Sequence, residues 1–231
     1  MTSPDPDDSH PVSAAAETVA DVLGIKPTWR GWIHLGATPL AVVAGIFLIL
    51  AAPTTLGKLT SAIYAVSGML LFGVSALYHR GSWTPKVKRV LKRLDHTNIM
   101  LVIAGTYTPV SALLLSRPTA TLVLWVIWIG AIAGVLFRVL WVNAPRWLYV
   151  PIYVALGMAA LVFMPELFAA SASATVLICI GGAFYIAGAV IYGIKKPNLS
   201  PKHFGFHELF HAFTVVAFAL HFTAVLIAVR R

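Results

Sequence analysis

The stretch "FHELFHAFTVVAFALHFTAVLIAV", residues 206–229, is apolar almost throughout. It is long enough to cross a bilayer, which takes about 20 helical residues. Six similar runs precede it, at 33–52, 61–79, 96–115, 119–142, 147–165 and 174–194. The runs are continuous rather than alternating, and a chain in hydrocarbon must pair its backbone polar groups within each segment. The sequence therefore predicts an all-α, polytopic membrane protein with a bundle of seven transmembrane helices.

The overall composition agrees with a membrane protein. Hydrophobic residues make up 59% of the 231 residues and charged residues 11%, whereas soluble domains carry about 25% charged residues. We expect one transmembrane domain over residues 26–231. Residues 1–25 are acidic and rich in Pro and Ser, which predicts a disordered or interfacial cytoplasmic segment, and they lack the basic start and apolar core of a signal peptide.

Charge placement predicts the orientation of the bundle. Of the 17 Lys and Arg residues, only Lys58, Arg117, Arg230 and Arg231 fall after the first, third, fifth or seventh run. Because basic residues stay in the cytoplasm, we expect a cytoplasmic N-terminus and an outside C-terminus in a bacterial inner (plasma) membrane. The net charge of +9 then reflects membrane topology rather than nucleic-acid binding. The segment "RGSWTPKVKRVLKRL", residues 80–94, also suits an amphipathic stretch resting on anionic headgroups.

Histidines and a carboxylate gather at the predicted inner face. His79 ends the second run, Asp95 precedes the third, and His207 and His211 open the seventh. Residues four apart share one helix face, so His207 lies beside His211 and Ser75 beside His79. Three imidazoles and a water make up an open, catalytic-type zinc site. The alternatives are hydrogen bonds between helices for the histidines, a bond of Ser75 to its own helix, and a capping role for Asp95.

The letters "HELFH", residues 207–211, also match the HExxH motif of zinc metalloproteases. Those enzymes take a third ligand downstream, but no acidic residue follows Glu208. His221 lies about 15 Å along the helix from His211 and about 80° around it. The third ligand must come from upstream, where His79 is the natural candidate, and a conventional metalloprotease is disfavoured.

Three stretches together resemble the hemolysin III family. They are "SALYHR" (75–80), "LDHTNIMLVIAGTYTPV" (94–110) and "HELFHAFTVVAFALHF" (207–222). That family is the bacterial branch of the progestin and adipoQ receptor superfamily, which includes the adiponectin receptors and is grouped with alkaline ceramidases. The resemblance covers about residues 26–229 and implies a Zn²⁺ ion near the inner leaflet. It implies that His79, His207 and His211 bind the metal, with Asp95 contacting the metal-bound water and Ser75 beside it.

A zinc ion can lower the pKa of its bound water to about 7. Asp95 is then the expected general acid–base group, and Ser75 a hydrogen-bond donor to the water or an oxyanion. The expected function is a zinc-dependent hydrolase of a lipid amide or ester, of the ceramidase type, with membrane lipids as substrates. The alternatives are a zinc-stabilised receptor or regulatory protein, and a membrane-permeabilising protein without catalysis.

Other polar residues are expected to support the fold or the site. His96 is expected to support the site without binding the metal, and His34, His203 and His221 are expected to be packed or interfacial. Glu208 either adds a carboxylate near the metal or matches HExxH by accident. The segment "AGTYTPV", residues 104–110, predicts close helix packing, with a substrate groove lined by Tyr107 as the alternative.

Overall fold

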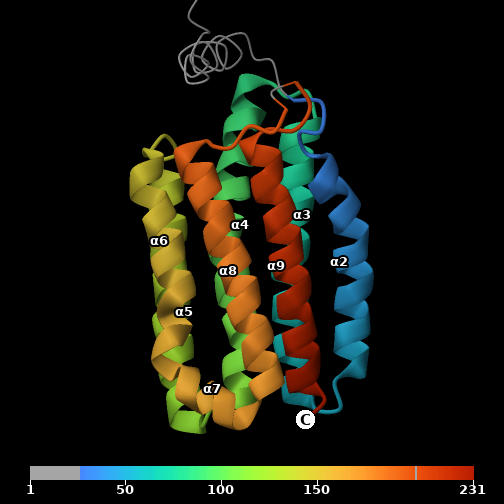
Figure 1. Ribbon diagram of the computed structural model, residues 1–231, viewed down its shortest axis with the longest axis vertical. Helices are drawn as coiled ribbons and strands as arrows, with labels where there is room; N and C mark the ends of the chain where they lie inside the picture. Colours follow the sequence, from blue (N-terminus) through green and yellow to red (C-terminus); the bar gives the residue numbers. More distant parts are fainter. Residues whose placement is uncertain (1–26, 201) are drawn as a thin grey trace, which may run out of the picture.

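The computed structural model describes residues 27–200 and 202–231, so the predictions for segment 1–25 lie outside the described part. Seven helical segments are long and apolar enough to cross a membrane (Figure 1), as predicted, and no strand forms within the described residues. The spans are α2 (Trp32–Ala51), α3 (Thr55–Arg80), α4 (Pro85–Leu114), α5 (Arg117–Leu140), Arg146–Ala170, α8 (Ala172–Ile194) and α9 (Phe206–Val229). The fifth span consists of α6 (Arg146–Met158), the 3₁₀ turn η1 (Ala159–Phe163) and α7 (Met164–Ala170).

The helix boundaries follow local sequence signals. The Thr54 hydroxyl accepts a hydrogen bond from the Gly57 N–H at 3.0 Å and caps α3. Thr84 caps α4, and Pro85 fits its first turn, where no N–H is needed. Of segment 80–94, which is expected to rest on the headgroups, residues 85–94 form the mostly exposed first part of α4. The 3₁₀ turn interrupts the fifth span just before Pro165, because proline disrupts the preceding helical turn.

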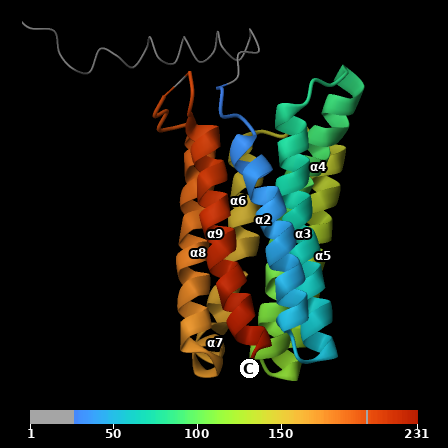
Figure 2. The same cartoon turned by 90° about the vertical axis from the view of Figure 1, so that its right-hand side faces the viewer.

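Helices α4 and α9 hold the bundle together. Helix α4 packs against α3, α5, α6 and α9, while α9 packs against α2, α3, α4 and α8. Figures 1 and 2 show the starts of α2, α4, α6 and α9 at one end, which we call the basic end, and the C-terminus at the other. Two apolar clusters fill the interior, one centred on α2, α3 and α9 and the other on α4, α5 and α6.

The segment "AGTYTPV" provides the predicted close helix packing, and its Tyr107 also borders a cavity. A Cβ atom on Gly105 would lie 2.2 Å from the Ser67 Oγ atom, so the missing side chain lets α3 and α4 approach. Tyr107 donates a hydrogen bond to the Gly157 carbonyl oxygen at 2.8 Å and also lines a cavity between the helices. Close packing at one residue and a cavity wall at another thus occupy the same helical stretch.

Candidate metal centre

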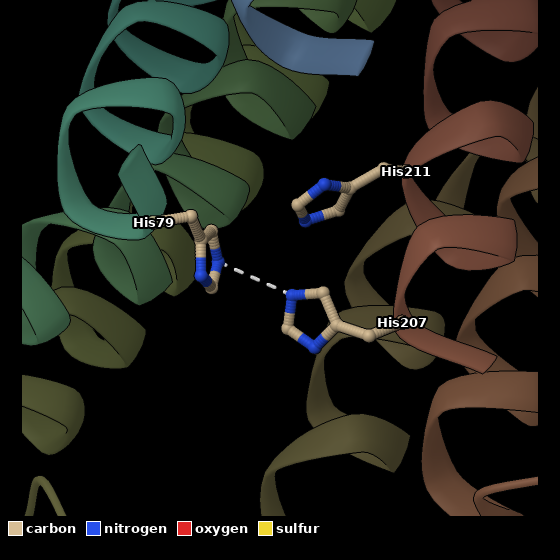
Figure 3. Close-up of side chains that lie close together, drawn as sticks. All are labelled: His79, His207 and His211. Carbon is tan, nitrogen blue, oxygen red and sulfur yellow. Dashed lines mark hydrogen bonds between the residues drawn. The ribbon is translucent and has the colours of Figure 1, made fainter. Parts of the chain in front are cut away.

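Three histidine side chains converge at the basic end of the bundle. His79 comes from the last turn of α3, and His207 and His211 come from the first two turns of α9 (Figure 3). One ring nitrogen from each lies within 4.8 Å of the others. The Nε2 atoms of His79 and His207 are 3.2 Å apart, and two nitrogens bound to a tetrahedral zinc ion at about 2.0 Å lie about 3.3 Å apart. The group therefore has the spacing of a metal site.

A carboxylate and a hydroxyl group lie beside the three imidazoles. The Asp95 Oδ2 atom on α4 is 3.9 Å from the His79 Nε2 atom. Ser75 is buried one turn before His79 on α3, with its hydroxyl group near enough to Asp95 to hydrogen-bond its carboxyl group. The structure thus brings together all five residues that the sequence placed at the site.

Glu208 is fully buried but faces a different set of partners. Its Oε2 atom accepts a hydrogen bond from the Gly205 N–H at 2.9 Å, which caps the start of α9. Its Oε1 atom forms an ion pair with the Arg30 Nε atom. Glu208 is also absent from the group of converging ligand atoms. The match to HExxH is therefore a match in sequence only. Glu208 caps α9 and pairs with Arg30 in the segment before α2, and it does not face the histidine group.

A long apolar cavity begins at the histidine group. Its volume is about 150 Å³, and its walls come mainly from α4, α6, α8 and α9. Ser75, Asp95, His207 and His211 line one end. A second hollow continues from it past Tyr107 and His221 towards α7. The polar centre therefore opens into a space that suits a hydrocarbon chain.

Comparison with known proteins identifies the family. The family model described as "Haemolysin-III related" matches residues 24–222. The chain belongs to the hemolysin III family. Its sequence is 30% identical over 191 residues to Hemolysin-3 of Bacillus cereus, covering 81% of this chain and 84% of that protein. It is similarly 30% identical over 191 residues to the Hemolysin-3 homolog of Bacillus subtilis, covering 81% and 86%.

The likeness extends to animal proteins. The chain is 28% identical over 176 residues to the human monocyte to macrophage differentiation factor, covering 73% of this chain and 69% of that protein. These matches place this hemolysin III family member within the progestin and adipoQ receptor superfamily, as its motifs predicted.

The other described histidines support the bundle. The His34 ring stacks on the His211 ring at 3.7 Å between centroids and fixes its orientation. His96 bonds through Nδ1 to the Lys92 carbonyl oxygen at 2.6 Å, and His203 to the Thr28 hydroxyl group at 2.9 Å. None of these is in the converging group; His34 is buried, as predicted, whereas His203 is exposed.

Segment 27–31 ties the start of α2 to the candidate site. The N–H groups of Thr28 and Trp29 donate to the carbonyl oxygens of Lys202 and His203 at 3.1 and 3.2 Å. Gly31 has a φ of 82°, and a Cβ atom on it would lie 2.8 Å from the His79 Cβ atom. This backbone packs directly against a candidate ligand, so any side chain at residue 31 would be strained and would press on His79.

Sequence reasoning missed an aromatic and cationic layer around the site. The Tyr192 ring meets the His207 ring edge-on at 5.5 Å, and the Arg146 guanidinium lies 4.5 Å from the Tyr192 ring centroid. Arg138 is 1% exposed and lies 4.2 Å from the Tyr149 ring centroid. From the sequence, Arg138 and Arg146 were interpreted only as basic residues that indicate which end of the bundle faces the cytoplasm. The only sequence signal for this layer was that Tyr149 and Tyr192 lie at the basic ends of two consecutive spans.

Proposed function

We propose that this hemolysin III family member is a zinc-dependent hydrolase that cleaves an amide or ester bond of a membrane lipid. One observation carries the proposal. Three histidines, two buried and one partly buried, lie with a carboxylate beside one of them at the end of an apolar cavity inside a membrane bundle. A polar reaction centre joined to space for a hydrocarbon chain matches the two halves of a lipid substrate.

The donor set fits zinc. His79, His207 and His211 would hold the ion, since three imidazoles with one open position are typical of catalytic zinc and carboxylate-rich sets favour calcium or magnesium. When bound, zinc supplies Lewis-acid activation of a water and of the scissile carbonyl group. The stacked His34 ring and the edge-on Tyr192 ring hold two of the imidazoles in place.

The remaining residues have distinct roles in this proposal. Asp95 accepts a proton from the attacking water and returns it to the leaving nitrogen or oxygen. Ser75 orients the Asp95 carboxylate and donates a hydrogen bond to developing negative charge. The walls of the cavity bind the acyl chain and exclude bulk water from the reaction.

We further propose that the basic end faces the cytoplasm, so that the substrate enters from the inner leaflet. The excess of Lys and Arg in the loops of that end supports this orientation. A reporter that is active only in the cytoplasm, fused after Arg231, should be inactive. An active reporter would invert the proposed topology.

The test of function combines metal analysis with turnover. Protein purified in detergent and loaded with zinc should release fatty acid from at least one member of a panel of ceramides and phospholipids, and removal of zinc should abolish the release. A fully loaded protein that releases nothing from the whole panel would contradict the hydrolase. Retained zinc with no turnover would favour the receptor or regulatory alternative.

Membrane permeabilisation is a second candidate, because two relatives carry the name Hemolysin-3. The polar residues of this chain gather at one end of the bundle rather than along a span, which disfavours a dedicated pore. Bilayer conductance that persists in His79→Ala would support permeabilisation without the metal centre.

A further inference from the structure

A second polar group lies deep in the apolar cavity, away from the three histidines. His221 on α9 and Tyr185 on α8 both line the cavity, with ring centroids 5.4 Å apart in an edge-on arrangement. His221 is only 7% exposed. Nothing in the hydrolytic role proposed above uses either residue.

Both side chains keep an unused hydrogen-bonding atom. The His221 Nε2 atom lies 3.1 Å from the Ile178 carbonyl oxygen, and a carbonyl can only accept, so Nε2 carries the proton. The Nδ1 atom is then an acceptor, and it is buried without a hydrogen-bond partner. The Tyr185 hydroxyl group is also buried without a partner. Leaving such groups unpaired is costly, and most buried polar groups have partners.

The packing holds the imidazole in this place. A Cβ atom on Gly181 would lie 2.4 Å from the His221 Cδ2 atom, so α8 supplies a gap that the ring fills. The nearby Tyr64 hydroxyl group, by contrast, donates a hydrogen bond to the Phe218 carbonyl oxygen at 3.0 Å. A buried tyrosine in the same region is thus fully paired, whereas Tyr185 is not.

The distance from the three histidines to His221 and Tyr185 indicates which part of a bound acyl chain would lie beside His221 and Tyr185. His221 follows His211 on one continuous helix, and the ten-residue separation corresponds to about 15 Å along its axis. With carbon–carbon bonds of about 1.5 Å, an extended hydrocarbon chain covers that length with about a dozen carbon atoms. A lipid headed by its carbonyl group at the histidine group would place its mid-chain carbons at His221 and Tyr185.

We propose that His221 and Tyr185 form a binding site for a hydroxyl group carried near the twelfth carbon of an acyl chain. The hydroxyl donates to the His221 Nδ1 atom and accepts from the Tyr185 hydroxyl group, which pairs both unused atoms. The inference rests on the proposed function only in taking this cavity as the acyl site. It makes oxygenated acyl lipids the preferred ligand class.

The test compares two free fatty acids that differ by one oxygen atom. Binding of 12-hydroxyoctadecanoic acid and octadecanoic acid to the detergent-purified, full-length protein is measured by calorimetry. We expect the hydroxylated acid to bind about tenfold more tightly, as two added hydrogen bonds in a buried site allow. In Tyr185→Phe the ratio of the two affinities should fall at least threefold.

Controls separate recognition from packing. Tyr64→Phe makes the same chemical change at a paired tyrosine, so it should lower thermal stability but keep the tenfold preference. With the wild type, 2-hydroxyoctadecanoic acid should gain no advantage over octadecanoic acid. Equal binding of the 12-hydroxy and unsubstituted acids, no binding of either, or a preference that survives Tyr185→Phe would overturn the inference. Free acids undergo no hydrolysis, so this outcome is independent of whether ceramide or phospholipid turnover is found.

Discussion

Two neighbouring residues at the start of α9 serve different faces of the same helical turn. His207, with His211 one turn later, faces His79 and the cavity. Glu208 points to Gly205 and Arg30 and contributes no atom to the group of converging histidine nitrogens. Successive residues are about 100° apart around a helix, so one short motif supplies both a candidate metal-binding face, called here the metal face, and an anchoring face. Shared letters with a metalloprotease therefore say little until the direction of each side chain is known.

The largest effect is expected on the metal face. His79→Ala and His211→Ala should each reduce the bound zinc from about one ion per chain to nearly none, because two imidazoles form a poor structural or catalytic set. Metal content of the purified protein, measured by mass spectrometry, checks this result. His203→Ala removes an exposed imidazole outside the group and should keep the zinc. Zinc retained after His79→Ala would contradict a metal site that is shared between α3 and α9.

The second prediction separates metal binding from turnover. Asp95→Asn should lower the rate of lipid hydrolysis by about 10² or more, as loss of a general acid–base group does, while the zinc content stays near that of the wild type. Turnover and metal content are measured on the same preparation. Glu166→Gln is the matched control, since that carboxylate bonds the Ser116 N–H at the opposite end of the bundle. An unchanged rate in Asp95→Asn would remove the carboxylate from the mechanism.

The anchoring face should respond in stability rather than in metal stoichiometry. Glu208→Gln leaves Arg30 without its buried partner and should lower the free energy of unfolding by about 3 kcal/mol. Thermal denaturation of the zinc-loaded protein measures the loss, and Arg30→Met should produce a comparable change. Complete loss of zinc from folded Glu208→Gln protein would show instead that Glu208 belongs to the metal face.

The sequence predicted the spans better than their surroundings. The run 206–229 coincides with α9, because hydropathy alone fixes a segment that must cross a bilayer. Helix α4 begins at Pro85 rather than at residue 96, since its exposed, basic first turns carry no hydropathy signal. Arg138 is buried against Tyr149, and no periodicity reveals how a helix in a crowded bundle is rotated.

The candidate site was predictable because its residues are of an unusual type for membrane spans. His79, His207 and His211 stand out because charged and titratable residues are rare in membrane spans, and four-residue spacing places two of them on one face. The unpaired state of His221 and Tyr185 was hidden, since it depends on which atoms of α8 and α9 meet. Local rules find residues of unusual type, whereas partners across helices need the packed structure.

The smallest expected effect is at Gly31, where the two faces meet. Its neighbour Arg30 holds Glu208, and its own backbone packs against His79. Gly31→Ala adds a Cβ atom at a positive φ, which costs about 1–2 kcal/mol, and presses on a candidate ligand. Zinc affinity should therefore fall about tenfold, as measured by competition with a chelating dye. Gly36→Ala, which meets nothing within 4 Å, should leave the affinity unchanged.

Combining Gly31→Ala with Glu208→Gln tests whether the Arg30–Glu208 ion pair determines how strongly a side chain at residue 31 lowers zinc affinity. With Arg30 held by Glu208, the backbone at residue 31 cannot retreat from the new Cβ atom, and His79 must move. With the ion pair broken, segment 27–31 can shift, so the added methyl group should cost less zinc affinity in the double variant than in the single one. Purely additive effects on affinity would mean that the two faces of α9 act independently.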